Sequence, residues 1–149
     1  GEFEDKLNAA DLTLLIQKPE TPVYVMADGR HFWRVIDNLM NNICKYAQPG
    51  TRVYVDLREN GGQVELIFRN TSRYPLNISS EELMERFVRG DESRNTEGSG
   101  LGISIAKSLM ELMGGSFMLY VDGDLFKVVL GFAQMEEEKE PLDEDKSGK

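Results

Sequence analysis

Two hairpin patterns constrain the fold of this chain more than any other feature of its sequence. In residues 51–70, apolar residues alternate with polar ones on both sides of Asn60-Gly61-Gly62. An Asn-Gly turn between two alternating segments is a strong short-range signal for a β-hairpin. Residues 116–134 repeat the pattern around Asp122-Gly123-Asp124. The sequence therefore predicts two antiparallel hairpins.

Three further segments have apolar residues at the three- and four-residue steps of an amphipathic helix. Residues 27–50 predict the longest helix, with Asp28 as its N-cap and Pro-Gly at its end. Residues 79–90 predict a short helix capped by Ser79 or the serine after it. Residues 101–113 predict a third helix.

Two short segments, residues 12–19 and 22–28, read as strands joined by a tight connection between Pro19 and Pro22. Helices and strands therefore mix along the chain, while the hairpins require antiparallel pairing. We expect an α+β fold, a two-layer α/β sandwich in which the helices cover one face of a mixed, mostly antiparallel sheet.

The chain has 149 residues, of which 40% are apolar, and this fits a single domain of ordinary size. We assign residues 11–135 to this domain. Residues 1–10 are expected to be a frayed leader that begins with a cloning remnant. Residues 136–149 carry seven acids and three lysines and are expected to be a disordered acidic tail.

The formal net charge of −9 argues against nucleic acid as a partner, because phosphates repel an acidic surface. No apolar run approaches the ~18 residues of a membrane span, so we expect no direct membrane contact by this segment. Cys44 is the only cysteine, which excludes an intrachain disulfide. His31 is the only histidine, which excludes a multi-histidine metal site.

Three glycines at positions 98, 100 and 102 stand directly before the helix predicted over residues 101–113. The first turn of a helix has unpaired N–H groups and favours an anion, and glycine lets the backbone approach it closely. This stretch can therefore cradle a phosphate. The alternative is a flexible loop, predicted over residues 90–100, followed by tight helix packing.

A polar stripe borders the apolar face of the first long helix. Asn38, Asn42 and Lys45 follow one another at helical spacing, and Tyr46 comes next. Asparagine is only a moderate helix former, so the presence of two asparagines beside the core needs a specific explanation. A carboxamide oxygen can bind Mg²⁺, and a lysine one turn further can meet phosphates. The alternative is an ordinary solvated helix face.

Three motifs, in this order and spacing, resemble those of sensor histidine kinases. "DNLMNNICKY" (37–46) resembles their N box, "ERFVRGD" (85–91) their F box, and "GSGLGISIAK" (98–107) their second glycine box. The resemblance covers residues 12–133, and it implies the Bergerat ATP-binding fold that gyrase-type and heat-shock-chaperone ATPases share.

The resemblance also implies a role for each matching residue, with ATP and Mg²⁺ as cofactors. Asn42 resembles the Mg²⁺-binding asparagine, and Asn38 the asparagine that orders the metal and phosphate surroundings. Lys45 resembles a phosphate-contacting lysine, Tyr46 a residue lining the nucleotide pocket, and Arg89 an arginine that reaches the γ-phosphate. A lid over residues 88–99 would be anchored by Phe87 and would end at the phosphate-facing glycines Gly98, Gly100 and Gly102. Leu101, between the last two, would also belong to the nucleotide site.

The first glycine box departs from the family pattern, which ends a strand in Asp-x-Gly-x-Gly. Here Asn70 stands at the position of the adenine-binding Asp, Ser72 at the first glycine, and Tyr74 near the second. A carboxamide oxygen can still accept from the adenine amino group, without the assistance of a charge. We expect ATP binding to be retained in weakened or altered form.

The resemblance implies a histidine protein kinase fragment that lacks its phosphoacceptor, since His31 has no acceptor motif around it. Its partners would be the dimerising helical domain of the same kinase and a downstream response regulator, with this domain in the cytoplasm and the parent protein anchored in the membrane. Two alternatives stay open: another Bergerat ATPase such as an anti-sigma-type serine kinase, or a degenerate scaffold that does not catalyse.

Overall fold

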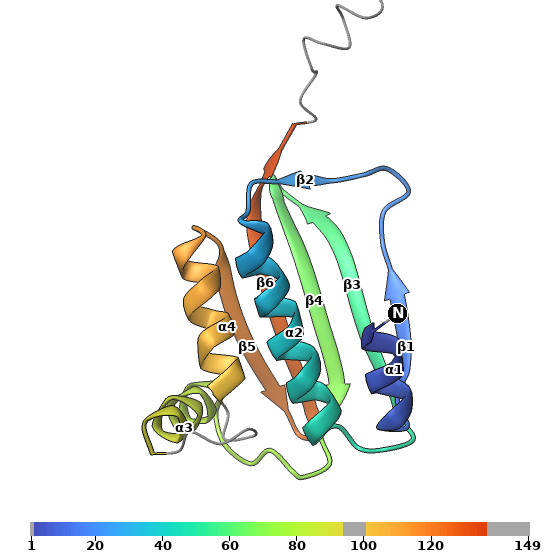
Figure 1. The fold of residues 1–149 in the computed structure, drawn as a ribbon, viewed down its shortest axis with the longest axis vertical. Coiled ribbons are helices and arrows are strands. Elements are labelled where there is room, and N and C mark those ends of the chain that lie inside the picture. Colours follow the sequence, from blue (N-terminus) through green and yellow to red (C-terminus); the bar gives the residue numbers. More distant parts are fainter. Residues whose placement is uncertain (1, 94–100, 137–149) are drawn as a thin grey trace, which may run out of the picture.

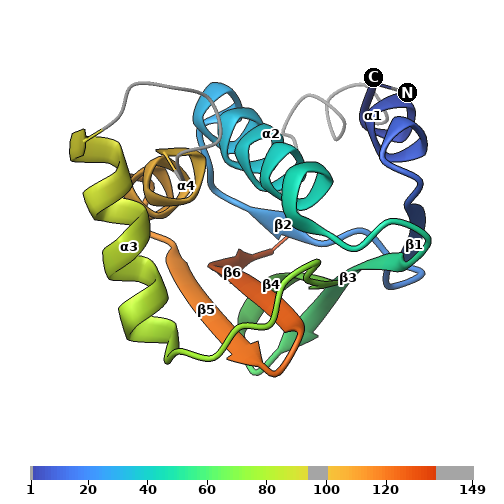
Figure 2. The same cartoon turned by 90° about the horizontal axis from the view of Figure 1, so that it is seen from below.

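The structure is a computed structural model that describes residues 2–93 and 101–136. These residues form four helices and a six-stranded sheet arranged in two layers (Figure 1). Figure 2 shows three of the helices on one side of the sheet, α3 (Ser80–Ser93) beside the edge strand β5 (Ser116–Asp122), and the other side of the sheet uncovered. The expected two-layer α+β sandwich is confirmed.

The sheet is mixed and mostly antiparallel. Its strand order is β1-β3-β4-β6-β2, with β5 also paired to β6, and only β1 and β3 run parallel. Both predicted hairpins form, as β3–β4 and β5–β6. The strands are β1 (Thr13–Gln17), β2 (Tyr24–Val25), β3 (Arg52–Asn60), β4 (Gln63–Thr71), β5 (Ser116–Asp122) and β6 (Leu125–Met135).

Local chemistry fixes the turns and helix starts where the sequence predicts them. Gly61 and Gly62 take positive φ angles of 58° and 84°, which suits a two-residue hairpin turn. The Asp28 carboxylate accepts hydrogen bonds from the backbone N–H groups of Arg30 (2.9 Å) and His31 (3.1 Å). Ser79 Oγ accepts from the backbone N–H of Glu82 at 3.1 Å. The helices are α1 (Glu2–Ala9), α2 (Gly29–Tyr46), α3 (Ser80–Ser93) and α4 (Leu101–Leu112).

The core lies between the sheet and the pair α2 and α4, which run side by side above it (Figure 1). Leu39 from α2 is 2% exposed, and Ile103 from α4 is fully buried. Val53, Val128 and Leu130 cover them from the sheet side. Burial of these side chains supplies the main driving force for the fold and sets the height of the helices above the strands.

Two expectations about segment structure were wrong. The predicted frayed leader is instead helix α1, in which Leu7 is 1% exposed and Phe3 stacks near Trp33 at a ring-centroid distance of 4.9 Å. Burying these apolar side chains offsets the entropy cost of ordering the end of the chain. The predicted loop over residues 90–100 is helical as far as Ser93, where α3 ends.

The rest of the loop and the acidic tail after Glu136 lie outside the described residues. Within the described ranges, no helix is both long enough and apolar enough to cross a bilayer.

Candidate functional site

A cavity of about 400 Å³ is lined by residues near the ends of α2 and β4 and by residues of α3. Figure 1 shows that α2 and β4 finish at the same end of the molecule, where α3 also lies. Four elements, α2, β4, α3 and β6, and one connecting segment contribute the wall of the cavity, so its shape depends on the tertiary fold and not on one motif. The wall consists of Asn42, Tyr46, Asn70, Ser72, Tyr74, Leu76, Leu83, Arg86, Phe87 and Phe126.

Helix α2 contributes Asn42 and Tyr46, which are one turn apart and therefore on one face of the helix. Asn38, one turn earlier, does not line the cavity. It lies against the first turn of α4, where a β-carbon built on Gly102 would be 3.4 Å from its Cβ. The Asn38 Nδ2 atom is buried and has no hydrogen-bond partner in the described part of the chain.

Strand β4 contributes Asn70, a polar residue that is only 4% exposed. It is paired with Val53 of β3 on one side and Phe126 of β6 on the other. Its backbone position is therefore fixed from both sides. An uncharged carboxamide stands at the inner wall of the cavity, among largely apolar neighbours.

The segment after β4 is tied to its surroundings by backbone hydrogen bonds. Gln48 N–H donates to the Thr71 carbonyl at 2.8 Å, and Arg73 N–H donates to the Tyr46 carbonyl at 2.8 Å. Ser72 N–H donates to the Asp124 carbonyl at 2.7 Å in the turn between β5 and β6. These bonds hold the rim of the cavity against the last turn of α2.

This anchoring of the backbone also determines where the side chains of the segment lie. The Ser72 Oγ atom accepts from the backbone N–H of Tyr74 at 3.2 Å, which turns the chain and leaves Tyr74 61% exposed at the mouth. Tyr74, near the second glycine position, therefore stands at the mouth, whereas Ser72, at the first glycine position, is buried on the wall with Asn70.

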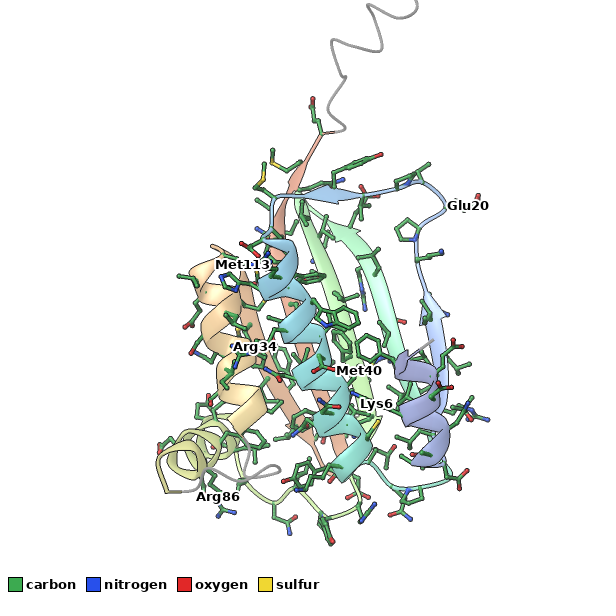
Figure 3. The ribbon with its side chains drawn as sticks, in the orientation of Figure 1. Lys6, Glu20, Arg34, Met40, Arg86 and Met113 are labelled. Atoms are coloured by element: carbon green, nitrogen blue, oxygen red, sulfur yellow. The ribbon has the colours of Figure 1, made fainter. Side chains whose placement is uncertain are left out.

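Helix α3 closes the third side with Leu83 and Phe87, which are one turn apart. Arg86 lies between them in sequence, and its Nη2 atom is 3.2 Å from Glu82 Oε2 in an exposed ion pair. Figure 3 shows Arg86 at the same end of the molecule as the end of α2. Sequence reasoning missed Arg86, although this residue lies within the motif of residues 85–91. It also missed Leu83 and Phe126, although Leu83 shares a helix face with Phe87 and Phe126 follows a predicted turn.

The structure brings four of the predicted binding residues onto one cavity: Asn42, Tyr46, Asn70 and Phe87. Lys45 is exposed beside it, with Nζ 5.7 Å from the centroid of the Tyr46 ring. The backbone of Arg89 is in α3 and that of Leu101 begins α4, while Gly98 and Gly100 lie outside the described residues.

Residues 27–141 match the family of histidine kinase-, DNA gyrase B- and HSP90-like ATPases. The chain belongs to this ATPase family. Among its relatives is the probable sensor kinase SilS of Salmonella typhimurium, 29% identical over 90% of this chain. The match covers 28% of SilS, so this ATPase domain corresponds to about a quarter of that protein.

Solved structures agree on the fold of this ATPase domain. The catalytic domain of the histidine kinase ThkA superposes with a TM-score of 0.73 over 89% of this chain and 86% of that one, at 20% identity. Full-length ShkA in complex with AMPPNP superposes with a TM-score of 0.69 over 90% of this chain and 28% of that one, also at 20% identity. Both solved structures therefore have the fold of this ATPase domain.

Proposed function

We propose that this domain binds Mg²⁺-ATP and supplies its γ-phosphoryl group to a histidine on a separate dimerising helical domain of the same kinase. A response regulator would receive the group afterwards. The observation that carries the proposal is the convergence of Asn42, Tyr46, Asn70 and Phe87 on one cavity. The complex of the similar kinase ShkA with AMPPNP supports it.

The cavity suits a nucleotide base in size and chemistry. Its volume of about 400 Å³ is within the usual range for small-molecule sites. Aromatic and aliphatic walls from Tyr46, Phe126 and Leu83 can cover the faces of a flat ring. Asn70 and Ser72 supply the few polar groups that orient a base.

Asn42 fits the role of a Mg²⁺ ligand. Mg²⁺ prefers oxygen ligands, keeps several waters and usually bridges to substrate phosphates, so one carboxamide oxygen is a sufficient protein contribution. Among the described residues, no cluster of three or more His, Cys, Asp or Glu side chains offers a competing metal site. The ion would neutralise phosphate charge, and Asn38 Nδ2 offers a donor near the same face of α2.

The triphosphate would extend from the cavity towards the start of α4. Helix N-termini favour anions, and α4 begins at Leu101, directly after the glycine stretch that includes Gly98 and Gly100. Lys45 adds a positive charge on the α2 side, and Arg89 would orient the γ-phosphate from the α3 side. Phosphoryl transfer depends mainly on such positioning and charge stabilisation.

The phosphoacceptor has to come from another domain. The single histidine, His31, lies in the first turn of α2, whereas Asn42 lies in the last part of the same helix. At 1.5 Å per residue this places them about 16 Å apart along the helix axis. We therefore expect this fragment to bind Mg²⁺-ATP but to turn it over very slowly alone.

The test is phosphorylation in trans. The domain is incubated with [γ-³²P]ATP and the isolated helical domain of its parent kinase, and acid-labile label on that domain is measured. We expect label only when both domains and Mg²⁺ are present, and none when the acceptor histidine is replaced by glutamine. Acid-stable label on a serine would instead favour the serine-kinase type of ATPase.

A further inference from the structure

We propose that the base site accepts 6-oxopurine nucleoside triphosphates nearly as well as ATP, because the group that meets the purine 6-position is the neutral carboxamide of Asn70. This inference rests on the proposed function, since it concerns the base bound in the same cavity. It extends that function from one nucleotide to a class of nucleotides.

Among the described residues that line the cavity, no carboxylate would select an amino group at position 6, because none of them is Asp or Glu. Arg86, the one cation among the described lining residues, is 56% exposed at the side chain and paired with Glu82. The buried polar part of the wall is Asn70 and Ser72, at 4% and 8% exposure, and both are neutral.

The Asn70 side chain can offer either a hydrogen-bond acceptor or a hydrogen-bond donor at the same position. Its Oδ1 atom accepts a hydrogen bond, its Nδ2 atom donates one, and a 180° rotation of the amide exchanges the two. The 6-amino group of adenine needs an acceptor there, and the 6-oxo group of hypoxanthine or guanine needs a donor. Within the described chain, no hydrogen bond to the side chain holds the carboxamide in one of these orientations.

Ser72 has the same versatility. Its Oγ atom accepts from the backbone N–H of Tyr74, which leaves the hydroxyl hydrogen and one lone pair to face the cavity. The hydroxyl rotates to donate or accept as its partner demands. Both buried polar groups can therefore adapt to either purine edge without a change in the backbone.

The backbone at Asn70 and Ser72 is held rigidly, so these side chains can adapt to a different base only by rotation. Asn70 is paired with residues of both neighbouring strands, β3 and β6. Ser72 N–H donates a hydrogen bond to the turn between β5 and β6. A carboxylate at position 70 would accept only, and it would repel a 6-oxo group. Asn70→Asp should therefore create a preference for ATP over 6-oxopurine nucleotides, which the natural residue lacks.

The experiment is titration calorimetry of the whole chain with Mg²⁺-ATP and with Mg²⁺-ITP. Inosine triphosphate changes only the 6-position and the adjacent ring nitrogen. We expect the two dissociation constants to agree within about tenfold, a free-energy difference of about 1.4 kcal/mol or less. In Asn70→Asp we expect the ratio of the ITP to the ATP constant to rise by about tenfold or more.

Asn60→Asp is the matched control, because it makes the same change in charge at an exposed site at the opposite end of the β3–β4 hairpin. In Asn60→Asp, the ratio of the ITP to the ATP dissociation constant should equal that of the natural chain. If ATP binds and ITP is more than tenfold weaker in the natural chain, the inference is overturned and the proposed function stands. If neither nucleotide binds at millimolar concentration, the proposed function fails and the inference fails with it.

Should Asn70→Asp unfold, Asn70→Ala serves as the second variant. It should weaken both nucleotides to a similar extent, because it removes the donor and the acceptor together. A loss confined to ATP would show that Asn70 acts as an acceptor only, and would overturn the inference.

Discussion

Asn42 near the end of α2 and Asn70 near the end of β4 line the same cavity of about 400 Å³. The hydrogen bond from Arg73 N–H to the Tyr46 carbonyl fixes the two elements to each other at that point. The helix side would hold the metal and phosphates, and the strand side would hold the base. In the proposed function, both parts of a nucleotide would therefore contact neutral carboxamides.

The first prediction concerns Asn42 and Mg²⁺. Asn42→Ala removes a hard oxygen ligand, so it should weaken ATP binding by about tenfold or more when Mg²⁺ is present and far less in EDTA. Calorimetry in both buffers measures this. Asn41→Ala is the control, because Asn41 is exposed and bonds only to Asp37 and Lys6 among the described residues. An equal loss with and without Mg²⁺ would remove Asn42 from the metal site.

The second prediction concerns helix α1. Leu7 is 1% exposed, so Leu7→Ala should lower the free energy of unfolding by about 2 kcal/mol or more. Urea unfolding followed by the fluorescence of Trp33, the only tryptophan, measures it, since Trp33 lies next to Phe3 of α1. Asn8→Ala, at an exposed position of the same helix, should change little. Equal stability of the two variants would mean that α1 does not pack as described.

The third prediction compares two glycines. A β-carbon on Gly115 would be 2.7 Å from the Gly131 carbonyl oxygen and 2.8 Å from Met110 Cε. Because β6 backbone cannot give way easily, Gly115→Ala should destabilise the domain by about 1–3 kcal/mol. Gly29 has nothing within 4 Å of such an atom, so Gly29→Ala should be neutral or slightly stabilising. Thermal unfolding distinguishes them, and a neutral Gly115→Ala would contradict this close contact.

The fourth prediction concerns pH and the cap of α2. The hydrogen bond from the His31 N–H, together with that from Arg30, holds the pKa of Asp28 below the usual aspartate value. A carboxyl with a lower pKa in the folded state stabilises that state above its unfolded pKa, and the benefit disappears as pH falls through the folded pKa.

The measurement is the unfolding temperature of the natural chain and of Asp28→Asn between pH 7 and pH 2.5. Asparagine is also a good N-cap but carries no titrating charge. The natural chain should be the more stable one at pH 7, and the gap should close below about pH 4. A gap independent of pH would show that the charge of Asp28 is irrelevant to the cap.

Much of the fold was predictable because its signals are local. Gly61-Gly62 marks one hairpin, Asp28 marks the start of α2, and the apolar face of α2 marks its buried side. The leader was not predictable in this way. Its short helix depends on long-range burial of Leu7 and on the contact between Phe3 and Trp33, which no local pattern announces.

The residues of the candidate site also divide into those that local sequence signals predict and those that they do not. Asn42, Tyr46 and Phe87 belong to motifs with readable spacing, so they were found. Arg86 and Phe126 reach the cavity only through the packing of α3 against the sheet layer and the β5–β6 turn, and sequence spacing does not encode that approach. The way in which Ser72 anchors Tyr74 at the mouth was likewise set by tertiary hydrogen bonds.

The central claim is that this cavity is the nucleotide site. The most direct measurement is a crystal structure of the chain grown with Mg²⁺ and a non-hydrolysable ATP analogue at millimolar concentration. The account predicts the base against Asn70 and Tyr46, with the metal on Asn42 and the phosphates towards the start of α4. An analogue bound elsewhere, or an empty cavity at saturating analogue, would contradict it.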